Sequence, residues 1–277
     1  MLDTQTGRSL VVAFDHGTEG AIRGGEDLPA MLDLIAGSRA DGVLLTTGTT
    51  PLYIQCAAKH PDAATVVAGL DIPVFGTRIG CGASLTTTRQ PWQPHDAQDA
   101  GAVMCKMLLP LGLRSIDIWA DALDRIARAA ADARRLHLPI MLEPAFWGPE
   151  SNESDTAILD AARLCIELGA SVLKVPAPRD NDALQRLVTW SPVPVLVLGG
   201  APRDGSEFLA NVIEWMKAGA VGVVVGRNVW NRPNPLAAIE ALGAAVHELD
   251  LDRAREHMAL AGAPLSAAAG SDEGDHE

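Results

Sequence analysis

The sequence has few aromatic residues, no long apolar run and no recognisable export signal. Aromatic residues make up 4% of the 277 residues and hydrophobic residues 48%, so the core must be aliphatic, which suits parallel strands covered by helices on both faces. No apolar run approaches the roughly 18 residues of a membrane span. The first four residues also lack the basic start and apolar core of a secretory signal. We therefore expect a cytoplasmic protein with no membrane partner.

Positive charge and metal-binding patterns are also scarce. The net charge of −13 argues against nucleic acid as a partner, because nothing is available to neutralise a run of phosphates. The histidines show neither H-x-H nor H-E-x-x-H spacing, so we predict no metal and no cofactor. The cysteines lack C-x-x-C spacing and are expected to be reduced, small hydrophobic residues. They are Cys56, Cys81, Cys105 and Cys165.

Short apolar runs alternate with helical patterns along the chain. These runs begin roughly thirty residues apart, which is the length of a βαβ unit. Eight such units predict an α/β fold, the (β/α)8 TIM barrel. The third strand is ambiguous, because either 65–70 or 72–75 fits. The expected strands lie at 10–14, 42–46, within 65–75, and at 103–109, 138–142, 172–175, 193–198 and 221–225.

The segments between these runs show helical periodicity. Gly169 and Gly219 stand where two of the helices should end, as left-handed caps. An open doubly wound sheet is the alternative fold, but residues 15–20 do not form the G-x-G-x-x-G loop that it usually carries. We expect a barrel domain over 1–260 and a disordered acidic tail over 261–277. Apolar stripes are formed by Leu123, Ile126, Ala130, Ala133 and Leu136, by Ile158, Ala162, Cys165 and Leu168, and by Phe208, Val212 and Trp215 or Met216.

Lys174 is a lone cation within the apolar run 170–176. Burial disfavours the charged form of an amine, so such a lysine must be paired, neutralised or used in chemistry. A deprotonated lysine is a nucleophile that forms a Schiff base with a carbonyl compound. The alternative is a strand-end lysine with a buried stem whose ammonium reaches water or a carboxylate.

Other polar residues stand at the ends of the predicted strands, where the active site of a TIM barrel lies. Asp15 and His16 follow the first strand, Lys106 lies within the fourth, and Glu143 ends the fifth. A partly desolvated Glu143 could have a raised pKa and move protons. The alternative is a salt bridge to a barrel lysine, and the two are compatible because such a contact tunes both groups. Lys106 could hold a substrate oxyanion or depress the pKa of Lys174 by like-charge repulsion. Asp15 could merely cap the next helix, and His16 is placed among the substrate- or phosphate-binding residues without a firm role.

The last two strands end in glycines. Gly199 and Gly200 follow the seventh strand, and Gly226 and Arg227 follow the eighth. These loops are the usual phosphate site of a TIM barrel, where backbone N–H groups approach the anion closely. The alternative is that the glycines only make tight turns. We favour a phosphate site.

The stretches 13–17, 169–174 and 226–230 together resemble the class I, Schiff-base aldolases of the DeoC/LacD/fructose-bisphosphate aldolase type. The likeness covers nearly the whole chain to about residue 250. It implies a metal-independent lyase that acts on a phosphorylated ketose, and a homo-oligomer by analogy. The family's Schiff-base lysine maps to Lys174 and its first-strand aspartate to Asp15. Its phosphate loops map to Gly199, Gly200, Gly226 and Arg227.

The resemblance is mixed within the family. The archaeal fructose-bisphosphate aldolases carry Trp-x-Tyr-Pro-Arg-Gly at the fifth strand, where this chain has Glu143-Pro144-Ala145. Glu143 and Lys106 instead resemble residues of the tagatose-bisphosphate and sulfofructose-phosphate aldolases. The Asp15-His16-Gly17 stretch follows the archaeal type.

The resulting hypothesis is a class I aldolase that makes or breaks a C–C bond in a phosphorylated ketose, or in a sulfo- or deoxy-sugar phosphate. Lys174 forms the Schiff base, Glu143 moves protons, Asp15 orients groups, and Lys106 stabilises an oxygen. One alternative is a barrel isomerase or synthase that uses Glu143 and Asp15 as acid and base without a covalent step. The other is a non-catalytic barrel that binds a sugar phosphate.

Overall fold

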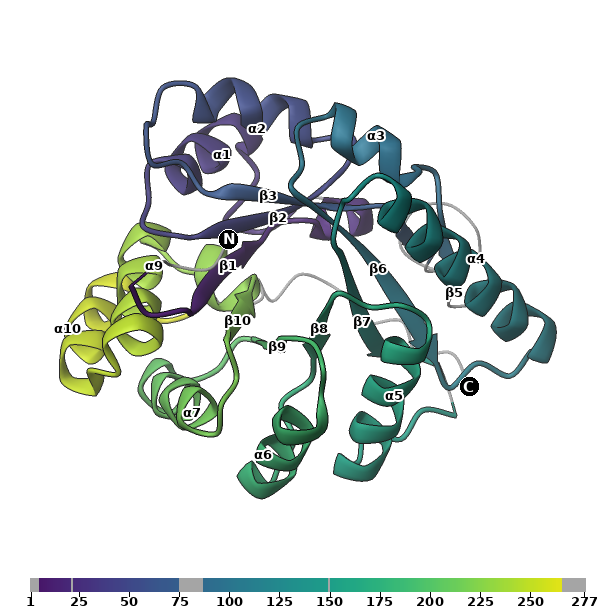
Figure 1. The fold of residues 1–277 in the computed structure, drawn as a ribbon. Coiled ribbons are helices and arrows are strands. Elements are labelled where there is room, and N and C mark those ends of the chain that lie inside the picture. Colours follow the sequence, from purple (N-terminus) through teal and green to yellow (C-terminus); the bar gives the residue numbers. More distant parts are fainter. Residues whose placement is uncertain (1–4, 21, 75–86, 149, 266–277) are drawn as a thin grey trace, which may run out of the picture.

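Parallel strands close into a barrel with helices around the outside (Figure 1). The computed structural model describes residues 5–20, 22–74, 87–148 and 150–265. The order around the barrel is β1-β10-β9-β8-β7-β6-β3-β2, with parallel pairing throughout. The barrel strands are β1 (Ser9–Ala13), β2 (Gly42–Thr46), β3 (Thr65–Gly69), β6 (Met104–Leu111), β7 (Ile140–Phe146), β8 (Val172–Val175), β9 (Val195–Leu198) and β10 (Gly222–Val225). The predicted (β/α)8 barrel is confirmed.

Helices follow the barrel strands and cover the outside of the barrel (Figure 1). Within the described residues, none of them is long and apolar enough to cross a membrane. They are η1 (His16–Glu19), α1 (Leu28–Ala36), α2 (Thr50–Ala57), α3 (Pro94–Asp99), α4 (Ile116–Arg135), α5 (Asp155–Glu167), α6 (Asn181–Trp190), α7 (Gly205–Lys217), α8 (Arg227–Trp230), α9 (Pro235–Gly243), η2 (Ala244–Glu248) and α10 (Leu251–Ala261).

The three apolar stripes lie on α4, α5 and α7, which bury the central residues of each stripe against the barrel. Side-chain caps start these helices: the hydroxyl of Ser115 accepts a hydrogen bond from a first-turn N–H of α4, and Ser154 does the same for α5. Gly169 and Gly219 follow α5 and α7 with φ of +99° and +101°. Both are in the left-handed region that glycine adopts without strain, as predicted.

The third strand resolves into two elements. β3 covers Thr65–Gly69 and pairs with β2 and β6, whereas β4 (Ile72–Val74) pairs antiparallel with β5 (Thr87–Arg89) outside the barrel. The first of the two predicted alternatives is therefore the barrel strand. The last residue of the second alternative, residue 75, lies outside the described residues. Cys81 and residues 266–277 of the predicted tail also lie outside them.

The strands β6 and β7 are longer than expected, running to Leu111 and Phe146, because they pair continuously with each other over seven residue pairs. Glu143 therefore lies in the middle of β7 rather than at its end. Strand side chains alternate between the two faces of a sheet. The inward set forms a closed apolar layer across the barrel interior, made by Val11, Ala13, Leu44, Val67, Met104, Met141, Val172, Leu196 and Val224.

Candidate active site

Charged side chains replace the apolar layer two residues further along four strands. Ala13 is followed by Asp15, Met104 by Lys106, Met141 by Glu143 and Val172 by Lys174. Because side chains two residues apart point to the same face, these four groups continue the inward-facing set toward the carboxyl ends of the strands. The alternation of the strands therefore brings the four predicted charged residues into one layer of the barrel.

Glu143 lies at the centre of this layer. Its Oε2 atom is 2.9 Å from the Nζ of Lys174 and 2.9 Å from the Nζ of Lys106. The three residues are only 9%, 6% and 3% exposed respectively. Two buried lysines thus share one carboxylate oxygen. The predicted pairing of Glu143 with a barrel lysine is found, and it involves both lysines.

The pKa of Glu143 is lowered, in contrast to the raised value expected from its apolar neighbours. Burial favours the neutral acid, but the attraction of Lys106 and Lys174 outweighs it and lowers the pKa. The sequence-based expectation failed because it considered the neighbours in the chain and not the two amines that the barrel brings in. Glu143 is therefore held as a carboxylate by the two amines.

Asp15 lies on the other side of Lys106, with its Oδ2 3.5 Å from Nζ. Its Oδ1 is 3.4 Å from the Nδ1 of His16. Burial would raise the pKa of Asp15, but attraction by Lys106, His16 and Lys174 lowers it to about 2. Its side chain makes no capping hydrogen bond to η1. The capping interpretation is therefore wrong, and Asp15 is a carboxylate paired with Lys106.

Burial also favours the neutral form of Lys106, but Glu143, Asp15 and Asp71 attract the ammonium and raise its pKa. Lys106 does not line the cavity described below. It contacts Glu143 and Asp15.

A further carboxyl, Asp71, was not predicted. It follows β3 and is 6% exposed. Its Oδ2 accepts a hydrogen bond of 3.0 Å from the backbone N–H of Leu108. The signal in the sequence was the alternation Val67, Gly69, Asp71, which places residue 71 on the inward face. The ambiguity of the third strand hid that signal.

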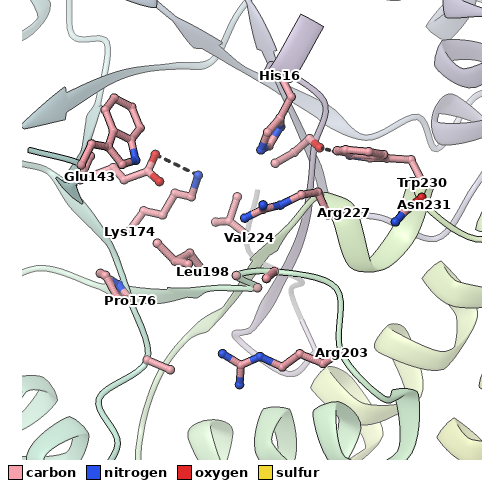
Figure 2. Close-up of a pocket in the computed structure, with 18 of the residues that line it drawn as sticks. His16, Glu143, Lys174, Pro176, Leu198, Arg203, Val224, Arg227, Trp230 and Asn231 are labelled. Atoms are coloured by element: carbon pink, nitrogen blue, oxygen red, sulfur yellow. Dashed lines mark hydrogen bonds and ion pairs between the residues drawn. The ribbon is translucent and has the colours of Figure 1, made fainter. Parts of the chain in front are cut away.

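A cavity of about 750 Å³ opens above the charged layer. In Figure 2, the amine of Lys174 lies beside Glu143, and the guanidinium groups of Arg203 and Arg227 lie on the side of Lys174 away from Glu143. Arg23 and Arg203 also line the cavity, and sequence reasoning had not singled them out. The predicted residues that line it are Lys174, Glu143, His16, Gly199, Gly200, Gly226 and Arg227.

The glycine loops are held together by Asn228, which is 1% exposed. Its Nδ2 donates hydrogen bonds to the carbonyls of Gly199 (3.1 Å) and Ala201 (3.0 Å), and its Oδ1 accepts one from the N–H of Arg203 (2.9 Å). Gly200 has φ of +67°. At Gly226 a Cβ would lie 2.8 Å from the Ala13 carbonyl oxygen, so no side chain fits there. These glycines therefore have structural requirements as well as access to the cavity.

His16 stands at the rim of the cavity, with its ring 5.5 Å from that of Trp230. The Trp230 indole donates a 3.0 Å hydrogen bond to the carbonyl of Ala13 and so connects α8 to the end of β1 (Figure 2). Within the described residues, no three His, Cys, Asp or Glu side chains are grouped so that they could hold a metal ion.

Comparisons with known proteins indicate a class of enzyme that agrees with the barrel fold and its buried lysines. The 2-amino-3,7-dideoxy-D-threo-hept-6-ulosonate synthase of Halobacterium salinarum is 34% identical over 260 residues, covering 93% of this chain and 92% of the relative. A class 1 fructose-bisphosphate aldolase of the same species is 29% identical over 264 residues, covering 88% and 92%. A solved Schiff base-forming fructose-1,6-bisphosphate aldolase superposes with a TM-score of 0.73 at 27% identity, covering 88% of this chain and 96% of that one.

The protein is thus an aldolase of the class I type, a carbon–carbon lyase. A model of the DeoC/LacD family aldolases matches residues 9–232. The chain belongs to this family, and the resemblance drawn from its motifs is confirmed.

Proposed function

We propose that this aldolase makes or breaks a C–C bond in a phosphorylated ketose, or in a sulfo- or deoxy-sugar phosphate, through a Schiff base on Lys174. The main support is the contact of 2.9 Å between Lys174 Nζ and Glu143 Oε2 at the base of the cavity. It supports the proposal because an amine and a carboxylate in contact at the carboxyl end of the barrel can serve as nucleophile and proton acceptor.

The first step needs a free amine. Glu143 Oε2 takes a proton from Lys174, and the nitrogen lone pair then attacks the carbonyl carbon of the substrate. The carbonyl oxygen becomes a hydroxyl by taking up a proton that Glu143 can return. The attacking nitrogen then loses a second proton to Glu143, which passes it to that hydroxyl, and departure of water leaves the protonated imine. The lowered pKa of Glu143 keeps the carboxylate ionised at rest, so its oxygen is open to receive this proton.

The imine then acts as an electron sink. Glu143 removes the proton of the hydroxyl next to the bond that breaks, the C–C bond electrons move into the imine to form an enamine, and an aldehyde leaves. Protonation of the enamine carbon and hydrolysis return the free lysine. The synthetic direction follows the same steps in reverse, which accommodates the synthase among the relatives.

Lys106 acts through Glu143 in this proposal. It contacts Glu143 and Asp15 and does not line the cavity, so it fixes the carboxylate beside Lys174 and stabilises its negative charge. Asp15 in turn fixes Lys106 and His16. The contacts with the reacting carbonyl group of the substrate then come from Lys174 and Glu143.

The phosphate occupies the glycine side of the cavity. Backbone groups at Gly199, Gly200 and Gly226 and the guanidinium of Arg227 line that side, and together they match the demands of a phosphate. Arg203 adds a second positive charge there (Figure 2). Binding the phosphate away from the reacting carbon helps to position that carbon. Among the relatives, the names fructose-bisphosphate aldolase and 2-amino-4,5-dihydroxy-6-oxo-7-(phosphonooxy)heptanoate synthase both describe phosphorylated compounds.

Borohydride trapping tests the proposal. The protein is incubated with fructose bisphosphate, with other ketose phosphates, with sulfosugar phosphates and with deoxy-sugar acids, each with and without borohydride, and its peptides are analysed by mass spectrometry. Reduction of the imine should leave a stable adduct on Lys174 with at least one of these compounds. Lys106 serves as the internal control, because it is also buried beside Glu143 and should carry no adduct.

The other outcomes separate the alternatives. Turnover without an adduct would support an isomerase or synthase that works by acid–base chemistry alone. Tight binding of a sugar phosphate with neither turnover nor adduct would support a non-catalytic barrel.

A further inference from the structure

The charged layer contains more carboxyl groups than its amines can pair. Lys106 and Lys174 supply two amines, while Asp15, Glu143 and Asp71 supply three carboxyls. Glu143 is within 2.9 Å of both lysines and Asp15 within 3.5 Å of Lys106. Within the described part of the chain, Asp71 forms no ion pair, and its side chain accepts a hydrogen bond from the Leu108 N–H. A buried layer with all five groups ionised would carry an uncompensated negative charge, which is costly.

The two oxygens of Asp71 are in different situations. Oδ2 accepts the hydrogen bond from Leu108, while Oδ1 is buried and has no hydrogen-bond partner among the residues that the structure describes. A buried carboxylate oxygen without a partner is unfavourable, whereas a neutral acid group has a much smaller desolvation cost. The surroundings thus favour a proton on Asp71.

Asp71 is also connected to Lys106 through the backbone. The N–H of Leu70 donates a 2.9 Å hydrogen bond to the carbonyl of Lys106, and the Asp71 side chain binds the N–H two residues further along β6. The segment Leu70–Asp71 therefore holds β6 directly after the Lys106 side chain.

We propose that Asp71 is a positioning residue of the active site, which carries a proton in the resting enzyme, keeps the buried layer neutral and leaves the Lys106 ammonium to Glu143 and Asp15. Its role in turnover rests on the proposed function, whereas its protonation does not.

The electrostatic surroundings agree. Burial raises the pKa of Asp71 to about 7, against the attraction of Lys106 and the hydrogen bond from Leu108, and the negative charges of Glu143 and Asp15 raise it further. These charged neighbours come from β6, from β7 and from the end of β1. On β2, the other neighbour of β3, the strand ends in Thr46 and is followed by Thr47, which are uncharged.

The consequence for catalysis is a change of state near neutral pH. When Asp71 loses its proton, a third negative charge competes for Lys106 and makes protons in the layer harder to remove. The Schiff base needs a lysine that has lost its proton. Ionisation of Asp71 therefore opposes the gain in free amine that rising pH would otherwise give.

Infrared spectroscopy tests the protonation without relying on activity. Wild-type protein, unlabelled and with isotope-labelled aspartate, is compared at pH values on both sides of neutrality. A carbonyl band of a protonated carboxylic acid should be present at the lower pH, shift with the aspartate label, weaken as pH rises, and be missing in Asp71→Asn. Absence of such a band in the folded wild type, or its persistence in Asp71→Asn, would overturn the proposal.

The pH dependence of kcat/KM tests the role in turnover. Asparagine keeps an oxygen for the Leu108 N–H and resembles a neutral acid that cannot ionise. The kcat/KM of Asp71→Asn should therefore lose the inflection near neutral pH that the wild type shows. Asp41→Asn is the matched control, because Asp41 accepts a strand N–H, that of Leu10, away from the cavity, and it should keep that inflection.

The two proposals fail in distinguishable ways. Trapping on Lys174 together with an unchanged inflection in Asp71→Asn would reject only the role of Asp71 in turnover. No adduct on Lys174 together with an Asp71 acid band would reject the Schiff base and leave the protonated aspartate in place.

Discussion

The two sides of the barrel mouth use different parts of the chain. On the side of β6, β7 and β8, side chains supply the charges, and Lys106, Glu143 and Lys174 contact one another directly. On the side of β9 and β10, glycines expose the backbone, and Asn228 holds their loops together through three hydrogen bonds. The charged side is therefore formed by the alternation of side chains along strands, whereas the glycine side is formed by contacts between loops.

The largest effect is expected from Lys174→Met, which breaks the charged side alone. Methionine keeps the apolar stem but removes the nucleophile, so kcat/KM should fall by at least about 1000-fold, as measured by aldehyde release. Glu143 keeps its contact with Lys106, so the fold should be retained. Circular dichroism and equilibrium binding of the sugar phosphate serve as controls. Activity near that of the wild type would reject Lys174 as the nucleophile.

Glu143→Gln is expected to have the next largest effect. It removes the proton acceptor beside Lys174, so kcat should fall about 100-fold with a smaller change in KM. Two ammonium groups would also lose their shared carboxylate, which lowers the stability of the fold by about 3 kcal/mol. Steady-state kinetics and urea unfolding measure the two losses separately. A change in KM alone would place Glu143 in substrate binding instead of proton transfer.

Much of the charged side was predictable from sequence, because each residue stands in an apolar strand where a charge is conspicuous. Lys174, Glu143, Lys106 and Asp15 were found in this way. Pairing of Glu143 with a barrel lysine was predicted, but its contact with both lysines was not, since that depends on the positions of β6, β7 and β8 around the barrel. That is why the direction of the Glu143 pKa shift was wrong.

The glycine side was predictable only in outline. Gly199, Gly200, Gly226 and Arg227 were found from their places after the last two strands, and all four line the cavity. Asn228 was missed because its function lies in contacts to a loop nearly thirty residues away. Arg203 was missed because nothing in the local pattern of its loop indicates that it lines the cavity.

Within the charged layer, the pKa values of two aspartates move in opposite directions. The pKa of Asp15 is lowered to about 2, so its stabilisation is complete above its unfolded pKa and is lost only as pH falls toward 2. The pKa of Asp71 is raised to about 7, so its stabilisation is complete below its unfolded pKa and is lost as pH rises toward 7.

The asparagine variants should therefore differ in sign at alkaline pH. Asp15→Asn should lower the free energy of unfolding by about 2 kcal/mol at both mildly acidic and mildly alkaline pH. For Asp71→Asn, the free energy of unfolding relative to wild type should rise by on the order of 2 kcal/mol when the pH is changed from mildly acidic to mildly alkaline. Urea unfolding at the two pH values measures both. Equal pH dependence in the two variants would contradict the opposite shifts.

The smallest effect is expected from Asn228→Ala, which breaks the glycine side and leaves the charged layer intact. It removes the three hydrogen bonds between the loops after β9 and β10. KM for the sugar phosphate should rise about tenfold, with kcat within about threefold of wild type, because the phosphate loses its positioned backbone groups while Lys174 keeps Glu143. Asn234→Ala is the matched control: Asn234 caps α9 by accepting a hydrogen bond from Ala237 and does not line the cavity. If Asn228→Ala lowered kcat and left KM unchanged, the two sides of the mouth would be coupled through the barrel, and the division of labour between side chains and backbone would not hold.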